Sequence, residues 1–193
     1  MPIRKAYQTL ENRDIHKIES DGPFPCLREN AWLGKGYYFW DSLIENAHWW
    51  GTVGACYKNG YVICESTFDL NDEKCFNLVD NPTHLQQFNQ TKEILVEQNL
   101  YKEGKTTVAR VITFIRKKSL FNYEAIRVFG INSVGFNSPY CNRTVFDYKN
   151  GKPSYQYLDS TPAIQINFFT KSSLNREGFK IVFPSEYTHG YLV

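Results

Sequence analysis

The stretch WLGKGYYFWD, residues 32–41, is the part of this 193-residue chain from which we infer the fold. Its two glycines flank a lysine, and glycine lets the backbone turn sharply or lets another group approach it closely. The aromatic run from Tyr37 to Trp40 favours a short β-strand, because aromatic side chains suit a pleated, half-buried surface. We therefore expect a glycine turn that leads directly into a strand.

A helix is predicted to follow this strand without a linker. Ser42 with Glu45 three residues later fits a capping box, so we expect the helix to begin at Ser42. Apolar residues at i, i+4 and i+7 form one stripe, made of Leu43, Ala47 and Trp50. Trp49 lies about a third of a turn away from that stripe. We therefore predict that Trp50 packs in the core and Trp49 lines a site; the alternative is that both tryptophans pack.

The segment from Gly34 to Asp41 resembles the central motif of ADP-ribosyltransferases of the diphtheria-toxin and poly(ADP-ribose) polymerase branch. In that family the pattern G-K-G-[IL]-Y-F-[AS]-[DE] opens a strand, and the next helix carries Ala-Asn-Tyr where this chain has Ala47-His48-Trp49. The family's strand tyrosine and helix aromatic sandwich the nicotinamide ring of NAD. The resemblance assigns these two roles to Tyr38 and Trp49. The other NAD-binding positions it implies in this segment are Gly36, Tyr37 and Ala47.

The family's first strand carries a His-Gly or Arg-Gly pair that orients the NAD ribose and grips the nicotinamide amide. In this chain we expect the first strand from Ile3 to Leu10, with Tyr7-Gln8-Thr9 near its end. The resemblance places Gln8 at the ribose, and no glycine follows it. A glutamine amide both donates and accepts hydrogen bonds. We therefore predict that Tyr7, Gln8 and Thr9 contribute to NAD binding.

The family also places a glutamate on a late strand. Cleavage of a glycosidic bond through an oxocarbenium-like state calls for a carboxylate near the ribose. The resemblance offers Gln165, before an apolar strand, as the first candidate and Gln156, between two tyrosines, as the second. Glu186 is a third candidate, in a Glu186-Tyr187 pair that is followed by only six residues. A glutamine holds a ribose hydroxyl but does not neutralise a cation, so the predicted catalytic residues are Tyr38 with Gln165 or Gln156.

Two helical patterns lie between residues 82 and 119. Asn81 followed by Pro82 is typical of a helix N-terminus, and the pattern predicts a helix that ends near Glu103. A second apolar pattern predicts another helix from Thr107 onward. We interpret the pair as an insertion, residues 82–119, between two halves of a sheet.

The rest of the pattern consists of short strands without the strand–helix alternation of a doubly wound sheet, which favours an α+β fold. Aromatic residues make up 16% of the chain and favour β-structure over a helical bundle. The length suits one domain, residues 1–193. The resemblance implies an ADP-ribosyltransferase-like arrangement of split antiparallel β-sheets.

The five cysteines are odd in number, widely spaced and without a C-x-x-C pair. This pattern argues against a disulfide framework or a structural zinc site and favours a cytoplasmic location. No apolar stretch suits a signal peptide or a membrane span, so we expect neither. The four histidines form no i, i+4 pair around an acid, and we expect no metal.

The resemblance implies a toxin-like enzyme that uses NAD as substrate and transfers ADP-ribose to a macromolecular acceptor, protein or nucleic acid. An antitoxin or other partner protein would accompany such a toxin. A second possibility is a module that binds NAD, ADP-ribose or a protein without turnover. A third is a nucleic-acid-binding module with a net charge of only +2. Its stacking and phosphate-binding residues would be Tyr37, Tyr38, Trp49, Trp50 and the basic segment from Arg116 to Lys118.

Overall fold

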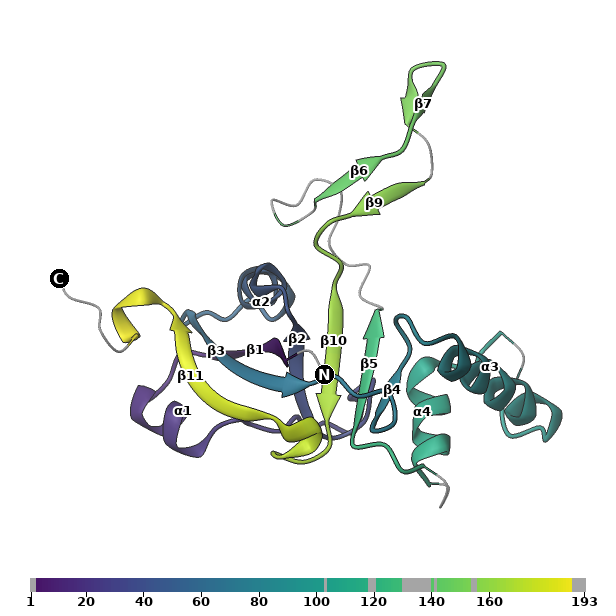
Figure 1. The fold of residues 1–193 in the computed structure, drawn as a ribbon, viewed down its shortest axis with the longest axis horizontal. Coiled ribbons are helices and arrows are strands. Elements are labelled where there is room, and N and C mark those ends of the chain that lie inside the picture. The colour runs from purple at the N-terminus through teal and green to yellow at the C-terminus, as the bar shows by residue number, and fades with distance from the viewer. Residues whose placement is uncertain are drawn as a thin grey trace.

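The computed structural model describes residues 3–102, 104–117, 121–129, 140, 142–153 and 156–188. Its main feature is a seven-stranded sheet (Figure 1). In their order across the sheet the strands are β11 (Glu177–Phe183), β3 (Tyr61–Asp69), β1 (Ile3–Glu11), β2 (Tyr37–Asp41), β10 (Ile164–Phe168), β5 (Ala125–Phe129) and β4 (Cys75–Asn77). Together with a few helices this sheet makes the chain an α+β protein, as predicted.

The sheet is mixed, because β4 and β5 are parallel while every other neighbouring pair is antiparallel. The implied antiparallel pairing of split sheets therefore does not extend to β4 and β5, which are parallel neighbours in this one sheet. The join between β1 and β2 is nevertheless short, since only Ala6 with Asp41 and Tyr7 with Trp40 form pairs. Beyond these two pairs the strands diverge, and the sheet opens along this line.

The predicted helical pair is present as α3 (Pro82–Glu97) and α4 (Val108–Lys117). The Asn81 side chain accepts a hydrogen bond from the His84 N–H at 3.1 Å, which confirms the predicted N-cap. The pair joins β4 to β5, and two parallel strands require such a crossover connection. Its apolar face covers one side of β4 and β5 through a cluster that includes Leu95, Val111, Ile112, Ile115, Phe76, Ile126 and Val128. The pair is thus the crossover that makes the sheet mixed.

The first helix of the pair ends earlier than predicted. The chain leaves α3 at Gln98, and Asn99 adopts a left-handed φ of 55°. The N–H groups of Leu100 and Tyr101 then return to the Leu95 carbonyl, at 3.0 and 3.1 Å. Asparagine is one of the few residues that adopts this conformation at modest cost, so it ends the helix before the expected Glu103.

An arm of two small antiparallel ribbons projects from the end of the sheet where β5 and β10 lie (Figure 1). One ribbon pairs β6 (Arg143–Val145) with β9 (Tyr157–Asp159), and the other pairs β7 (Tyr148–Lys149) with β8 (Lys152–Pro153). The turn at Asn150-Gly151 lies at its tip, with both residues at positive φ. The arm stands apart from the layers that form the core.

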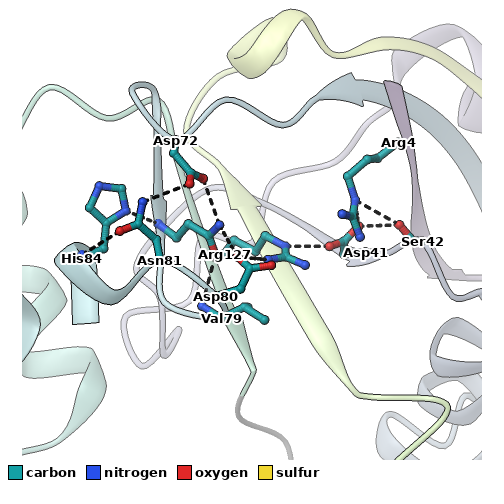
Figure 2. Close-up of polar contacts among 10 residues, drawn as sticks. Arg4, Asp41, Ser42, Asp72, Val79, Asp80, Asn81, His84 and Arg127 are labelled. Carbon is teal, nitrogen blue, oxygen red and sulfur yellow. Dashed lines mark hydrogen bonds and ion pairs between the residues drawn. The ribbon is translucent and has the colours of Figure 1, made fainter. Parts of the chain in front are cut away.

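A buried charge network joins the middle of the sheet to the loop before α3 (Figure 2). The Asp41 carboxylate is 1% exposed and accepts from Arg127 Nε at 2.7 Å and from Arg4 Nε at 3.1 Å. Arg127 also donates through Nη1 to Asp80 and to Asn77, both at 3.1 Å. Each charged side chain of this network has an oppositely charged partner, as a buried ion requires.

The same network explains why the predicted capping box does not form. Ser42 has a φ of 64°, and its hydroxyl donates to Asp41 Oδ1 at 2.7 Å. Helix α2 (Ile44–Trp49) therefore begins two residues later, with Leu43 as an N-cap that makes no side-chain hydrogen bond. None of the helices in the described part of the chain combines the length and apolar character needed to cross a bilayer.

Candidate functional site

A cavity of about 630 Å³ opens where β1 and β2 diverge. This volume falls in the range typical of sites for small molecules. Strand β1 contributes Gln8, Thr9 and Leu10, and strand β2 contributes Tyr38, Phe39 and Trp40. The remaining wall comes from Arg13, Gln165, the turn after α2 with Trp50, Gly54, Ala55 and Tyr57, and seven residues of the loop before β2, namely Phe24, Pro25, Cys26, Arg28, Asn30, Ala31 and Trp32.

Four of the residues predicted from the sequence line this one cavity, namely Gln8, Thr9, Tyr38 and Gln165. They come from three neighbouring strands, β1, β2 and β10. Tyr38 lies opposite Asn167 and Trp40 lies opposite Gln165, so Tyr38 and Gln165 share one face of the sheet. The other predicted residues do not line the cavity.

The Tyr38 ring forms part of the wall, and its hydroxyl is held by the glycine turn. The hydroxyl donates to the Gly34 carbonyl at 2.9 Å and accepts from the Leu33 N–H at 2.8 Å. Burial raises the pKa of this phenol well above its ordinary value. Tyr38 is therefore neutral at physiological pH, and it presents its ring rather than its hydroxyl to the cavity.

The structure exchanges the roles predicted for Trp49 and Trp50. Trp49 is 3% exposed and packs edge-on against Trp40 in the core, with ring centroids 6.0 Å apart. Trp50 is half-buried and lines the cavity. Tyr38 packs beside a different apolar cluster from Trp49, so the predicted Tyr38–Trp49 sandwich is wrong.

The reason for this exchange is a change of helical period after Trp49. Helix α2 continues into a π-helical turn, η1 (Trp50–Gly54), in which the Ala55 N–H bonds to the Trp50 carbonyl at 2.7 Å. This wider turn breaks the period of about 3.6 residues on which the prediction depended. A Cβ atom at Gly54 would come within 2.5 Å of the Trp50 ring. Glycine at position 54 thus leaves room for the indole that lines the cavity.

The Gln8 side chain is fully engaged with the backbone. Its Nε2 donates to the Phe24 carbonyl at 2.9 Å and to the Tyr38 carbonyl at 3.3 Å, and its Oε1 accepts from the Phe24 N–H at 2.9 Å. The amide therefore spans the gap between β1 and β2 and fastens the loop after α1 (Ile15–Asp21) to the sheet. Both amide hydrogens are in use, so Gln8 builds the wall and does not act as the predicted ribose donor.

The neighbours of Gln8 in the predicted tripeptide hold other elements. Thr9 Oγ1 donates to the Ala47 carbonyl at 2.9 Å and ties α2 to β1. Tyr7 is buried in the cluster of Trp49 and Ala47, and burial together with Glu65 raises its pKa to about 12. Ala47 is fully buried, so Tyr7 and Ala47 support the site from behind.

Gly36 and Tyr37 also lie outside the wall. A Cβ atom at Gly36 would collide with the Asn167 side chain and lie 2.6 Å from the Phe168 carbonyl, so glycine permits the close approach that the sequence predicted. The group that approaches Gly36 is strand β10, and not a ligand. Tyr37 packs beside a cluster that includes Phe39, on the face of β2 opposite to Tyr38.

The late-strand candidates are far apart. Gln165 is 6% exposed, and its Oε1 accepts a hydrogen bond from Trp32 Nε1 at 3.1 Å. Gln156 is exposed on the arm, which excludes it from this cavity. Glu186 is exposed in the turn η3 (Ser185–Tyr187) after the edge strand β11. Of these three, Gln165 alone lines the cavity.

The charge of the cavity wall is positive. Arg13 and Arg28 line it, and none of the described residues in the wall carries a carboxylate. The Arg13 guanidinium lies over the Phe24 ring at 5.1 Å from its centroid. Two exposed cations in one wall suit a ligand with phosphate groups. Among the residues that the structure describes, no group of three potential ligands could hold a metal ion.

The basic segment at the end of α4 has a structural role. The Arg116 guanidinium lies 3.9 Å from the centroid of the Phe169 ring and donates to the Leu33 and Lys35 carbonyls at 3.4 and 3.3 Å. Burial lowers the pKa of Arg116. Lys118 lies outside the described residues. With Trp49 buried and Tyr37 on the opposite face, the aromatic platform of a nucleic-acid-binding module is not assembled.

Sequence reasoning missed the part played by Trp32, Trp50, Arg13 and Arg28. The proximity of Trp32 to the glycine turn was the one local signal for its position, whereas the arginines lie in irregular segments that carry no periodic pattern. Their contribution depends on how residues 24–32 fold over the sheet. Compared with protein-family models, curated proteins and solved structures, the chain matches none.

Proposed function

We propose that the protein binds NAD in the cavity between β1 and β2 and transfers its ADP-ribosyl group to a macromolecular acceptor, as an ADP-ribosyltransferase-like domain of toxin type. One observation carries the proposal. Tyr38 and Gln165, assigned from the sequence motif to the nicotinamide ring and the scissile bond, line one cavity from adjacent strands and share one face of the sheet.

In this proposal Trp50 takes the part first given to Trp49. The nicotinamide lies between the rings of Tyr38 and Trp50, which both line the cavity. The pyrophosphate lies toward Arg13 and Arg28, whose guanidinium groups form hydrogen-bonded pairs with phosphate oxygens. Stacking of a flat ring on an aromatic side chain contributes about 1–3 kcal/mol per ring.

The proposed reaction breaks the bond between ribose C1′ and the nicotinamide nitrogen. The electron pair of that bond goes to the pyridinium nitrogen, which leaves as neutral nicotinamide. A nucleophilic oxygen or nitrogen of the protein or nucleic-acid acceptor forms the new bond to C1′ and releases its proton to water. No described carboxylate faces the developing ribosyl cation, so we expect slow turnover.

The test uses the purified full chain with NAD labelled in its adenylate part and a cell lysate as the source of acceptors. We expect label on macromolecules together with release of free nicotinamide. The Tyr38→Ala variant is the control, because it removes one wall of the nicotinamide site. Absence of both label transfer and nicotinamide release, in a protein that is folded by circular dichroism, would rule out the transferase.

A second candidate is a module that binds NAD or ADP-ribose without turnover. The absence of a carboxylate from the described cavity wall favours it. Calorimetry with ADP-ribose, combined with the labelling experiment, separates the two candidates. Binding without any product supports the module, and binding with product supports the enzyme.

We also propose that the protein works in the cytoplasm, with a partner protein such as an antitoxin where it acts as a toxin. The four cysteines that the structure describes are free thiols, Cys26, Cys56, Cys64 and Cys75. Free thiols are in keeping with a reducing compartment. Fractionation of the native cells tests the location, and recovery of the protein outside the cytoplasm would contradict it.

A further inference from the structure

The Gln165 side chain makes a single hydrogen bond within the described structure, and that bond fixes the direction of its amide. Trp32 Nε1 donates to Gln165 Oε1 at 3.1 Å. An indole nitrogen carries one hydrogen and accepts no hydrogen bond, whereas a glutamine amide has one accepting end and one donating end. The oxygen of Gln165 must therefore face Trp32.

The donating end of Gln165 is consequently left for the cavity. Gln165 is 6% exposed and lines the cavity, and no described residue accepts a hydrogen bond from its Nε2. This Nε2 is not among the fully buried atoms without a partner in the described residues, so water or a ligand in the cavity can accept from it. Gln165 thus presents the two N–H bonds of its amide to the cavity at this point.

The indole that sets this direction is itself held firmly. Its segment closes on the strand through Cys26 and Gly36, whose backbones exchange hydrogen bonds of 2.7 and 3.3 Å. Asn167 Nδ2 donates to the carbonyls of the next two residues after Trp32, Leu33 and Gly34, both at 3.1 Å. Trp32 cannot follow Gln165 if the amide turns, so the indole determines the orientation.

We infer that Trp32 is a positioning residue that makes Gln165 a dedicated hydrogen-bond donor to the ligand, and that its partner is an oxygen of the ribose next to the nicotinamide. The inference rests on the proposed NAD site. The hydrogen bond from Gln165 Nε2 is then the polar contact by which the cavity recognises that ribose. ADP-ribose contains this ribose, whereas ADP lacks it. The cavity should therefore prefer ADP-ribose to ADP through Gln165.

The test measures the dissociation constants of ADP-ribose and ADP by calorimetry for four proteins: the natural chain, Trp32→Phe, Gln165→Met and the double variant. Phenylalanine keeps an aromatic ring at position 32 but removes the N–H. We expect each single variant to bind ADP-ribose about fivefold more weakly, the usual effect of one lost hydrogen bond, with the affinity for ADP unchanged. The double variant should match Gln165→Met, because Trp32 acts through Gln165.

Trp50→Phe is the matched control, since it makes the same substitution in another indole of the same cavity. It should leave the ratio of the ADP-ribose and ADP affinities unchanged, because neither ligand carries the nicotinamide that Trp50 is proposed to contact. Equal weakening of both ligands in Trp32→Phe would mean that the indole only supports the wall, and the inference would be wrong. Additive losses in the double variant would also overturn it. A natural chain that binds neither ligand would instead contradict the proposed function.

Discussion

Gln8 binds Phe24 as a neighbouring β-strand would, with one hydrogen bond to its carbonyl and one from its N–H, both of 2.9 Å. The Gln8 side chain thus makes the hydrogen bonds that a paired strand would make, at the point where β1 and β2 separate. The Gln8→Glu variant keeps the shape and the acceptor but cannot donate to the carbonyls of Phe24 and Tyr38. We expect a loss of about 1–3 kcal/mol in the free energy of unfolding, measured with urea.

The control for Gln8→Glu is Gln90→Glu, the same chemical change at an exposed position of α3. Such a surface change should alter stability by less than about 0.5 kcal/mol. Equal stability of the two variants would show that the contacts of Gln8 with Phe24 and Tyr38 contribute nothing to folding.

The two adjacent tryptophans should respond to truncation in opposite ways. Trp50→Ala removes a ring from the cavity wall, so NAD binding should weaken by about 1–3 kcal/mol. Trp49→Ala empties a buried site in the core and should cost about 3–5 kcal/mol of stability. Calorimetry and urea unfolding on both variants measure these effects. If Trp49→Ala remained stable and lost NAD binding while Trp50→Ala bound normally, the original sandwich with Tyr38 would have to be restored.

Gln165→Glu should accelerate the cleavage of NAD. The carboxylate would accept from Trp32 Nε1 with one oxygen and face the cavity with the other, where it stabilises the developing ribosyl cation. Water then attacks C1′, and the products are ADP-ribose, nicotinamide and a proton. We expect the rate of nicotinamide release to rise by about tenfold or more. Chromatography of the reaction mixture measures this rate.

Gln156→Glu is the matched control for this gain, because it makes the same change on the exposed arm. It should leave the rate at the level of the natural chain. A rate increase in Gln156→Glu and none in Gln165→Glu would move the catalytic position from β10 to the arm.

The stability of the protein should fall at acid pH through Glu65. Burial alone would raise the pKa of this carboxyl, but Lys5 at 3.0 Å and Lys180 at 3.5 Å outweigh it, and the pKa lies below its ordinary value. Since the folded state binds this proton more weakly than the unfolded state, the contribution is complete above about pH 4.3 and is lost as the pH falls through the lower, folded-state pKa.

Urea unfolding between about pH 3 and 6 measures this effect, and Glu65→Gln is its control. The variant should be less stable than the natural chain at the upper end of this range and should show a flatter dependence on pH. Parallel pH profiles of the two proteins would exclude Glu65 as a source of acid sensitivity.

Local patterns were sufficient to predict the elements whose signals are local. The aromatic run of β2 and the Asn81 cap of α3 depend on neighbouring residues, and both predictions are confirmed. The sequence motif also assigned Tyr38 and Gln165 to one site. In the structure they lie on the same face of the paired strands β2 and β10. The parallel pairing of β4 with β5 is not visible in either strand alone.

Failures occurred where a specific contact or a change of helical period overrides a local preference. Ser42 has the composition of an N-cap, but the Asp41 carboxylate engages its hydroxyl and the helix starts later. Trp50 fits the core stripe of an α-helix, yet the π-helical turn moves it to the cavity. Gln8 could hydrogen-bond a ribose, but both hydrogens of its amide are donated to the backbone carbonyls of Phe24 and Tyr38. For Gln8 the competing partners, Phe24 and Tyr38, lie on other segments, whereas Ser42 is held by its own neighbour.

The short join between β1 and β2 has a mechanical consequence. With two residue pairs in register and the Ser42 N–H bonded to the Lys5 carbonyl at 2.8 Å, few backbone bonds resist a hinge motion of β11-β3-β1 against the remaining strands. A ligand that contacts both Thr9 on β1 and Tyr38 on β2 would hold the two parts of the sheet together across this hinge. Amide hydrogens on either side of the line would then exchange with solvent more slowly, so an occupied cavity would stiffen the entire sheet.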